Sequence, residues 1–239
     1  MAAFEPDADK VCVTFARPTS LKESRDYIGA MATLSAQELY RATRFRFERD
    51  RRLFVASRAL LRRTLSRYLN VEPAAWRFDT DLYGRPHIVF PAEGRMLRFS
   101  SSRTEGLVMC AVAYNRNIGA DVERLRECPL DVLDYSFASA EAQSVRERMG
   151  NEQSERFFAL WTLKESYVKA RGLGMSIPLD KVAFQLSDDR PPRLEVDSLL
   201  DNQALGWRFF SLRPTPRHWA ALCVYSLDQP TVDIVAIWD

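Results

Sequence analysis

Hydrophobic residues recur at helical spacing in two long stretches of the chain. One is "FVASRALLRRTLSRYL", residues 54–69, and the other is "RFFALWTLKESYVKA", residues 156–170. An apolar residue at every third or fourth position turns one face of a helix toward a core. The second stretch continues into "RGLG", and glycine just past the last periodic residue is typical of a helix C-terminus. The pattern therefore predicts two long amphipathic helices.

Shorter runs rich in β-branched and aromatic residues predict strands. "AAWRFD" follows a turn at Pro73, and the apolar run "GLVMCAVAY" is separated from "IGADVE" by the turn-rich "NRN". We expect later strands at "KVAFQL", "WRFFSL", "AALCVYS" and "VDIVAIW", and a loop at "SDDRPPR". The pattern indicates an α+β fold, with helices packed against two mostly antiparallel sheets.

A helix followed by a strand occurs twice at similar offsets. Phe54 precedes Trp76 by 22 positions, and Trp161 precedes Val182 by 21. Such spacing hints at two related halves, although the identities are too few to establish a repeat. The turn between Tyr114 and Asn117 is the expected boundary, giving an N-terminal lobe of residues 1–115 and a C-terminal lobe of residues 116–239.

Positive charge is concentrated in one segment. The chain of 239 residues has a net charge of only +2. The segment from Arg41 to Arg67, however, contains ten arginines and only two acidic residues, Glu48 and Asp50, so its own net charge is +8. Such a segment attracts phosphate. One alternative is a nucleic-acid-binding module built on "RATRFRFERDRR", where aromatic residues alternate with arginines.

Targeting and cysteine signals indicate the cytoplasm. "MAAFEPDADK" has neither a basic nor an apolar region of a signal peptide, and no apolar run approaches the roughly 20 residues of a membrane helix. Cys12, Cys110 and Cys223 lie in apolar segments without a CxxC spacing, so we expect neither disulfides nor zinc. His87 and His218 are expected to be structural or surface residues.

Three carboxylates are candidates for a metal site. Asp121 and Glu123 lie two apart in "GADVE", so a strand directs both to one face, where like charges repel unless water or a cation separates them. If Glu165 approaches that face, the oxygen donors suit Mg²⁺, which is commonly completed by substrate phosphates. A solvated strand end and a surface ion pair between Glu165 and Lys169 remain open alternatives.

Common nucleophile and nucleotide motifs are absent. The chain has no GxSxG, GxGxxG or GxxxxGK[ST], which disfavours hydrolase, Rossmann and P-loop classes. "FSSSRT", residues 99–104, is expected to be a turn that offers hydroxyl and backbone N–H groups to phosphate.

Four motifs in order resemble a known family. "YGRP" (83–86), "FSSSRT" (99–104), "IGADVE" (118–123) and "LWTLKESYVKARGLG" (160–174) together resemble the 4′-phosphopantetheinyl transferases. The likeness is to the larger, two-lobed class that primes carrier proteins of peptide, polyketide and fatty-acid synthesis. It runs from about Arg41 to Leu186, and the last two motifs are highly specific in combination. The resemblance implies a monomer with two similar lobes related by pseudo-twofold symmetry and coenzyme A in the cleft between them.

The resemblance also implies roles for individual residues. Asp121, Glu123 and Glu165 fall on the magnesium ligands, Glu165 also on the general base, and Lys169 on a lysine that contacts the pyrophosphate. The remaining coenzyme A contacts that it implies are Arg41 and Arg49 (with Arg58 a weaker candidate) near the 3′-phosphate, Gly84, Arg85 and Pro86 in the adenine-side turn, and Ser101, Ser102, Arg103 and Lys164.

The implied reaction moves phosphopantetheine from coenzyme A to a serine hydroxyl of an apo-carrier protein and releases adenosine 3′,5′-bisphosphate. The nucleophile then belongs to the partner, which explains why this chain has no nucleophile motif. Ser100 and Arg103 depart from the family pattern, which has asparagine and histidine there, but arginine still binds phosphate through its planar fork. A non-catalytic member that only binds carrier proteins is a further alternative, which the intact carboxylates disfavour.

Overall fold

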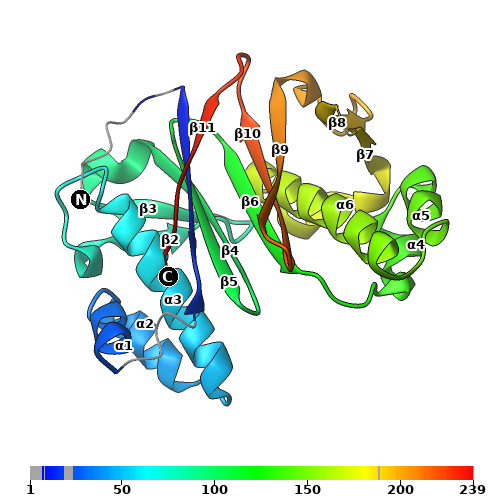
Figure 1. The fold of residues 1–239 in the computed structure, drawn as a ribbon. Helices are drawn as coiled ribbons and strands as arrows, with labels where there is room; N and C mark the ends of the chain where they lie inside the picture. The colour runs from blue at the N-terminus through cyan, green and yellow to red at the C-terminus, as the bar shows by residue number, and fades with distance from the viewer. Residues whose placement is uncertain (1–6, 8, 19–23, 188, 239) are drawn as a thin grey trace. The chain divides into compact units, whose positions relative to one another are not determined.

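The structure, a computed structural model, describes residues 7, 9–18, 24–187 and 189–238. The chain divides into two compact units, one formed by Met1–Arg116 with Pro230–Asp239 and the other by Asn117–Gln229. Figure 1 shows helices packed beside sheets in each unit, and the predicted α+β class is confirmed. No helix in the described ranges is long and apolar enough to cross a membrane.

The N-terminal unit is built on a sheet with the order β11-β1-β5-β4. Its strands are β1 (Lys10–Ala16), β4 (Leu97–Thr104), β5 (Leu107–Tyr114) and β11 (Thr231–Trp238), with β1 and β11 parallel and the other pairs antiparallel. Helix α3 (Glu48–Leu65) packs against this sheet, and α1 (Ser24–Met31) and α2 (Ala36–Thr43) pack on α3. A hairpin of β2 (Arg77–Thr80) and β3 (Pro86–Phe90) completes the unit.

The C-terminal unit is built on an antiparallel sheet with the order β6-β10-β9. Its strands are β6 (Ile118–Arg124), β9 (Trp207–Thr215) and β10 (His218–Tyr225). The long helix α6 (Gly150–Arg171) packs on β6 and β10, α5 (Ser139–Arg146) packs on α6, and α4 (Leu133–Ser136) contacts α5. A hairpin of β7 (Val182–Ser187) and β8 (Arg190–Val196) follows α6.

The two units share one topology. Each begins with a strand, continues through helices to a two-stranded hairpin, and ends with a second hairpin whose last strand pairs with the first strand. The order β1-β5-β4 in one unit thus corresponds to β6-β10-β9 in the other. The matching offsets in the sequence reflect this repeated topology.

Three local expectations are corrected. "VDIVAIW" forms β11, which pairs with β1 of the N-terminal unit, whereas the sequence analysis placed it in the C-terminal lobe. "FSSSRT" lies in strand β4, and the turn comes afterwards, at Gly106 with φ 88°. "RPPR" of the expected loop belongs to β8 of the β7–β8 hairpin, where an edge strand tolerates proline.

Candidate active site

Glycine at position 119 brings helix α6 directly against strand β6. Gly119, Asp121 and Glu123 share one face of the strand because side chains alternate. A Cβ on Gly119 would lie 1.9 Å from the carbonyl oxygen of Ser166 and 2.4 Å from the amide nitrogen of Ala170. The helix backbone therefore packs where a side chain would be, which places the carboxylates of β6 beside the last turns of α6.

Asp121 and Lys169 form the central contact between these elements. The Lys169 Nζ lies 2.6 Å from Asp121 Oδ1 and also donates a hydrogen bond to the Ala120 carbonyl at 3.2 Å. Asp121 is only 4% exposed. A predicted metal ligand and a predicted phosphate-binding lysine thus meet at one point.

Glu165 lies one helical turn before Lys169 on the same face of α6. Burial raises the pKa of Glu165, and the charge of Asp121 raises it further; Lys169 opposes these effects and Glu123 adds to them. The charges of Asp121 and Glu123 thus oppose ionisation of the Glu165 carboxylate. A proton or a cation would relieve this repulsion.

The donor set fits magnesium chemically, because all three side chains offer hard oxygens. Within the described ranges, however, no group of three or more His, Cys, Asp or Glu side chains is already arranged to hold a metal ion. Lys169 occupies Asp121 Oδ1, and Arg126 lies 3.0 Å from Glu123 Oε2. A cation that binds at these two oxygen atoms would displace the basic side chains from them.

A cavity of about 460 Å³ opens beside Glu165 within the C-terminal unit. Its walls are largely apolar, and Asp180 adds a second carboxylate. The main lining residues are Tyr135, Val168, Ile177, Pro178 and Leu179. Part of a ligand can therefore reach the Glu165 carboxylate.

Lys164 is buried within the C-terminal unit. Its side chain is 0% exposed, and its ammonium lies 2.7 Å from Glu141 Oε2 while donating to the carbonyls of Leu179, at 2.9 Å, and Val182. Burial lowers the pKa of Lys164, and the charge of Glu141 opposes this. The lysine joins α6 to α5 and to the segment before β7, which indicates a structural role, and coenzyme A binding by Lys164 stays a prediction.

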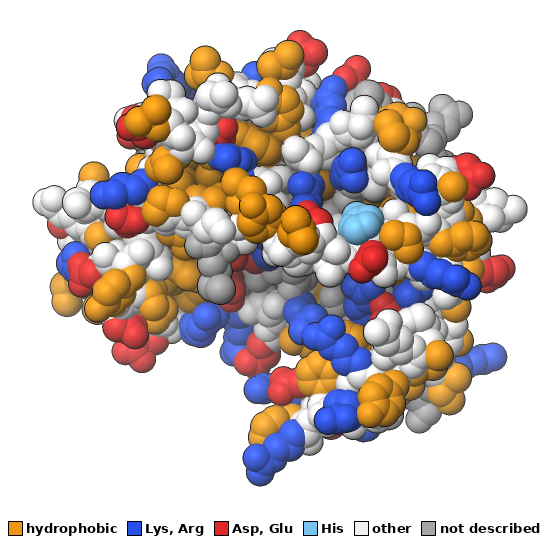
Figure 2. All heavy atoms as spheres, turned by 180° about the vertical axis from the view of Figure 1, so that it is seen from behind, with side chains coloured by type: hydrophobic (Ala, Val, Ile, Leu, Met, Phe, Trp, Pro, Cys, Tyr) orange, Lys and Arg blue, Asp and Glu red, His pale blue; other side chains and the backbone are white. Residues whose placement is uncertain are grey.

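In the N-terminal unit, Arg41 and Arg103 come together over the ring of Phe54. Their guanidinium carbons lie 5.4 and 5.8 Å from the ring centre. Burial lowers the pKa of Arg103, and the positive charges of Arg41 and Arg58 lower it further. Figure 2 shows basic side chains gathered where α2 and α3 lie. Like charges held this closely favour an anion, as predicted for Arg41 and Arg103.

The other coenzyme A contacts predicted in this part of the chain, Arg49, Ser101 and Ser102, do not all lie on the same side as Arg41 and Arg103. Arg49 is exposed, at 72% of its side chain, and lies near Asp50 at 3.5 Å and Glu105 at 3.9 Å. Ser101 shares a face of β4 with Arg103, whereas alternation turns Ser102 to the opposite face. The two serines therefore do not face the same ligand from this strand.

The "YGRP" segment forms a tight turn between β2 and β3. Gly84 has φ 81°, which favours glycine, and Asp81 Oδ1 accepts hydrogen bonds from the backbone N–H groups of Tyr83 and Arg85 at 2.9 and 3.0 Å. Burial lowers the pKa of Arg85. Gly84 and Arg85 thus lie in one ordered turn, and Pro86 begins β3 directly after it.

Sequence reasoning missed two buried acids that fix the position of α6. Glu141 binds Lys164 and also accepts from the backbone N–H of Phe184 at 2.8 Å. Asp201 accepts hydrogen bonds from Tyr167 at 2.6 Å and Trp207 at 2.7 Å, and Arg171 lies 2.8 Å from it. Burial alone would raise the pKa of Asp201, but these hydrogen bonds and charges lower it overall. Neither acid belongs to a spacing pattern, so no sequence signal singled them out.

Comparison with known proteins identifies the class. Residues 22–115 match the family model "4'-phosphopantetheinyl transferase, N-terminal", and residues 117–223 match the "4'-phosphopantetheinyl transferase superfamily". The chain belongs to this family, as its motifs predicted, and is a transferase that moves phosphopantetheine from coenzyme A to carrier proteins.

Individual relatives span most of the chain. 4'-Phosphopantetheinyl transferase HetI from Nostoc sp. (strain PCC 7120) is 36% identical over 195 residues, 81% of this chain and 79% of that protein. 4'-Phosphopantetheinyl transferase Sfp from Bacillus subtilis (strain 168) is 28% identical over 180 residues, 75% of this chain and 77% of that protein. A solved holo-(acyl-carrier-protein) synthase from Bacillus anthracis, in complex with CoA, covers 46% of this chain and is itself covered to 94%, with 18% identity and a TM-score of 0.38.

Proposed function

We propose that the transfer depends on magnesium and that Asp121, Glu123 and Glu165 hold the ion. The observation that carries this proposal is the contact of Asp121 with Lys169 where α6 packs on β6, one helical turn from Glu165. The all-oxygen donor set supports Mg²⁺, which would neutralise charge on the pyrophosphate of coenzyme A.

The side chains of this site then have separate roles in the transfer. Glu165 accepts the proton of the carrier serine, a role that its raised pKa supports because a base works best when its pKa lies near the working pH. Lys169 leaves Asp121 and donates to a pyrophosphate oxygen, since an ammonium binds phosphate as a point charge. The serine oxygen forms a bond with the phosphorus on the pantetheine side of the pyrophosphate, and the P–O bond to the nucleotide phosphate breaks, which releases adenosine 3′,5′-bisphosphate.

The nucleotide end of coenzyme A is assigned to the N-terminal unit. Arg41 binds the 3′-phosphate and Arg103 binds a pyrophosphate oxygen, and the position of both arginines at the Phe54 ring supports these roles. Gly84, Arg85 and Pro86 contact the adenine. Buried free thiols at Cys12, Cys110, Cys128 and Cys223 support a reducing compartment, and we propose a cytoplasmic monomer.

The test of the metal site is direct binding of Mg²⁺. Isothermal titration of the metal-stripped protein in the presence of coenzyme A should give a saturable heat that Asp121→Asn removes. Asp180→Asn is the matched control, because Asp180 lines the cavity beside Glu165 without contacting Lys169. Equal magnesium binding by both variants would move the metal away from β6.

A further inference from the structure

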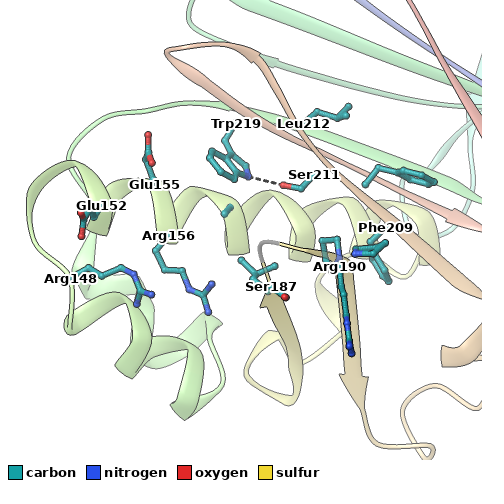
Figure 3. A pocket seen from close by; sticks show the side chains of 15 residues that line it. Arg148, Glu152, Glu155, Arg156, Ser187, Arg190, Phe209, Ser211, Leu212 and Trp219 are labelled. Atoms are coloured by element: carbon teal, nitrogen blue, oxygen red, sulfur yellow. Dashed lines mark hydrogen bonds between the residues drawn. The ribbon is translucent and has the colours of Figure 1, made fainter.

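A second cavity, of about 650 Å³, lies in the C-terminal unit between the first turns of α6, the β7–β8 hairpin and strands β9 and β10 (Figure 3). Arg156 lines it, and Glu165 of the proposed active site follows nine residues later on α6. At 1.5 Å per residue, the two lie about 13 Å apart along the helix. The volume is typical of a small-molecule site, and the proposed function does not use it.

Two arginines form one end of this cavity. Arg148 Nη1 donates to the Ser144 carbonyl, and Arg156 Nε donates to the Ser144 hydroxyl at 3.1 Å. Because both arginines donate to Ser144, their guanidinium groups lie close together. Burial lowers the pKa of Arg156, and the charge of Arg148 lowers it further. Two partly buried like charges in contact with a cavity favour an anionic ligand group.

The nearby acids offset the charge of this end only in part, because the charge of Glu141 raises the pKa of Arg156 but burial and Arg148 outweigh it. Glu155 lies 2.9 Å from Arg213, and the buried Glu141 is committed to Lys164. In Figure 3 the carboxylate of Glu155 points away from the guanidinium groups of Arg148 and Arg156. The arginine end of the cavity is therefore cationic.

The rest of the wall combines apolar side chains with Ser187, Arg190 and Ser211. Trp219 donates its indole N–H to the Ser211 hydroxyl at 3.1 Å, and the Arg213 guanidinium lies 4.4 Å from its ring centre. The other apolar lining residues are Leu186, Pro191, Pro192, Phe209 and Leu212. A ligand that enters can bury an apolar body while its charged head reaches the arginines.

We propose that this cavity binds a small amphipathic anion, with a carboxylate or phosphate head at Arg148 and Arg156 and an apolar body against Trp219 and Phe209. The observation behind it is the pairing of two guanidinium groups on Ser144 at the end of a cavity with apolar residues in its wall. A volume of about 650 Å³ suits a small molecule. The inference is independent of the transferase chemistry.

The test uses 8-anilinonaphthalene-1-sulfonate, whose sulfonate and aromatic rings match the proposed head and body. The full chain is titrated in saturating coenzyme A, so that the substrate site is filled. Arg148→Gln and Arg156→Gln should each weaken the probe about tenfold or more, the value of one charge-assisted hydrogen bond. Arg146→Gln is the matched control, because Arg146 lies on α5 and pairs with the exposed Asp134. Its affinity should equal that of the wild type.

Competition identifies the head group. Displacement of the probe by octanoate indicates a carboxylate ligand, and displacement by phenyl phosphate indicates a phosphate ligand. Either result supports the proposal. Arg156→Gln removes a contact with Ser144, so its fold is checked by circular dichroism. Trp219→Ala provides a second variant, which should also bind the probe more weakly. Equal probe affinity in all variants, or displacement only by an oligoglutamate peptide, would overturn the proposal.

Discussion

Replacing Lys164 by methionine tests whether this lysine supports the fold or binds substrate. The variant keeps an apolar stem in the core but leaves the Glu141 carboxylate, 4% exposed, without its cation. Removing one partner of a buried ion pair costs about 3–5 kcal/mol. In a chain of this size each kcal/mol shifts Tm by roughly 2–4 °C, so we expect a fall of about 6–20 °C.

The assay combines unfolding with steady-state kinetics. Calorimetry gives Tm, and the KM for coenzyme A is measured well below the transition, where we expect a change of less than about threefold because no substrate contact is lost. The double variant with Glu141→Gln should recover part of the stability, since it removes the unpaired charge. An unchanged Tm with a tenfold rise in the KM for coenzyme A would refute this reasoning and return Lys164 to the substrate site.

Three further predictions follow from the same structure. Gly119→Ala should destabilise the protein by about 3 kcal/mol or more in denaturant titration, because its methyl group would overlap the α6 backbone; a loss under 1 kcal/mol would mean that the helix moves freely. The lowered pKa of Asp201 means that it contributes stability above its unfolded pKa, near 3.9, which is lost as pH falls through the folded pKa. In Asp201→Asn the free energy of unfolding should therefore fall less steeply as the pH is lowered, and an unchanged pH dependence would contradict this. Arg41→Ala should raise the KM for coenzyme A about tenfold or more while leaving dephospho-coenzyme A unaffected, whereas the exposed neighbour Arg44→Ala should change neither; equal losses on both substrates would move Arg41 away from the 3′-phosphate.

Local patterns in the sequence predicted much of the fold. The apolar period defines most of α6, and the glycines after it end the helix, with Gly172 at φ 68°. Short apolar runs identified β5, β6 and β10, and alternation along β6 placed Asp121 and Glu123 on one face. These features depend on neighbours within a few residues, which a sequence displays directly.

Long-range pairing could not be predicted in the same way. The alternation of "VDIVAIW" is compatible with either sheet, and only its hydrogen bonds with β1, more than 200 positions earlier, assign it to the N-terminal unit. The sequence gives no reason to treat Lys164 and Lys169 of α6 differently. In the structure Lys164 forms a buried ion pair with Glu141 of another helix, whereas Lys169 pairs with Asp121 of a strand. Such distinctions arise from tertiary contacts.

The account depends most on Glu165 acting in phosphopantetheine transfer. Its most direct test is the intact mass of an apo-carrier protein after incubation with coenzyme A, Mg²⁺ and either the wild-type chain or Glu165→Gln. Glu152→Gln, a change at an exposed acid of the same helix, is the matched control. We predict that the wild type and the control add one phosphopantetheine at equal rates, while Glu165→Gln is slower by roughly a hundredfold or more, the usual contribution of a general base. A Glu165→Gln variant as fast as the wild type would contradict the account.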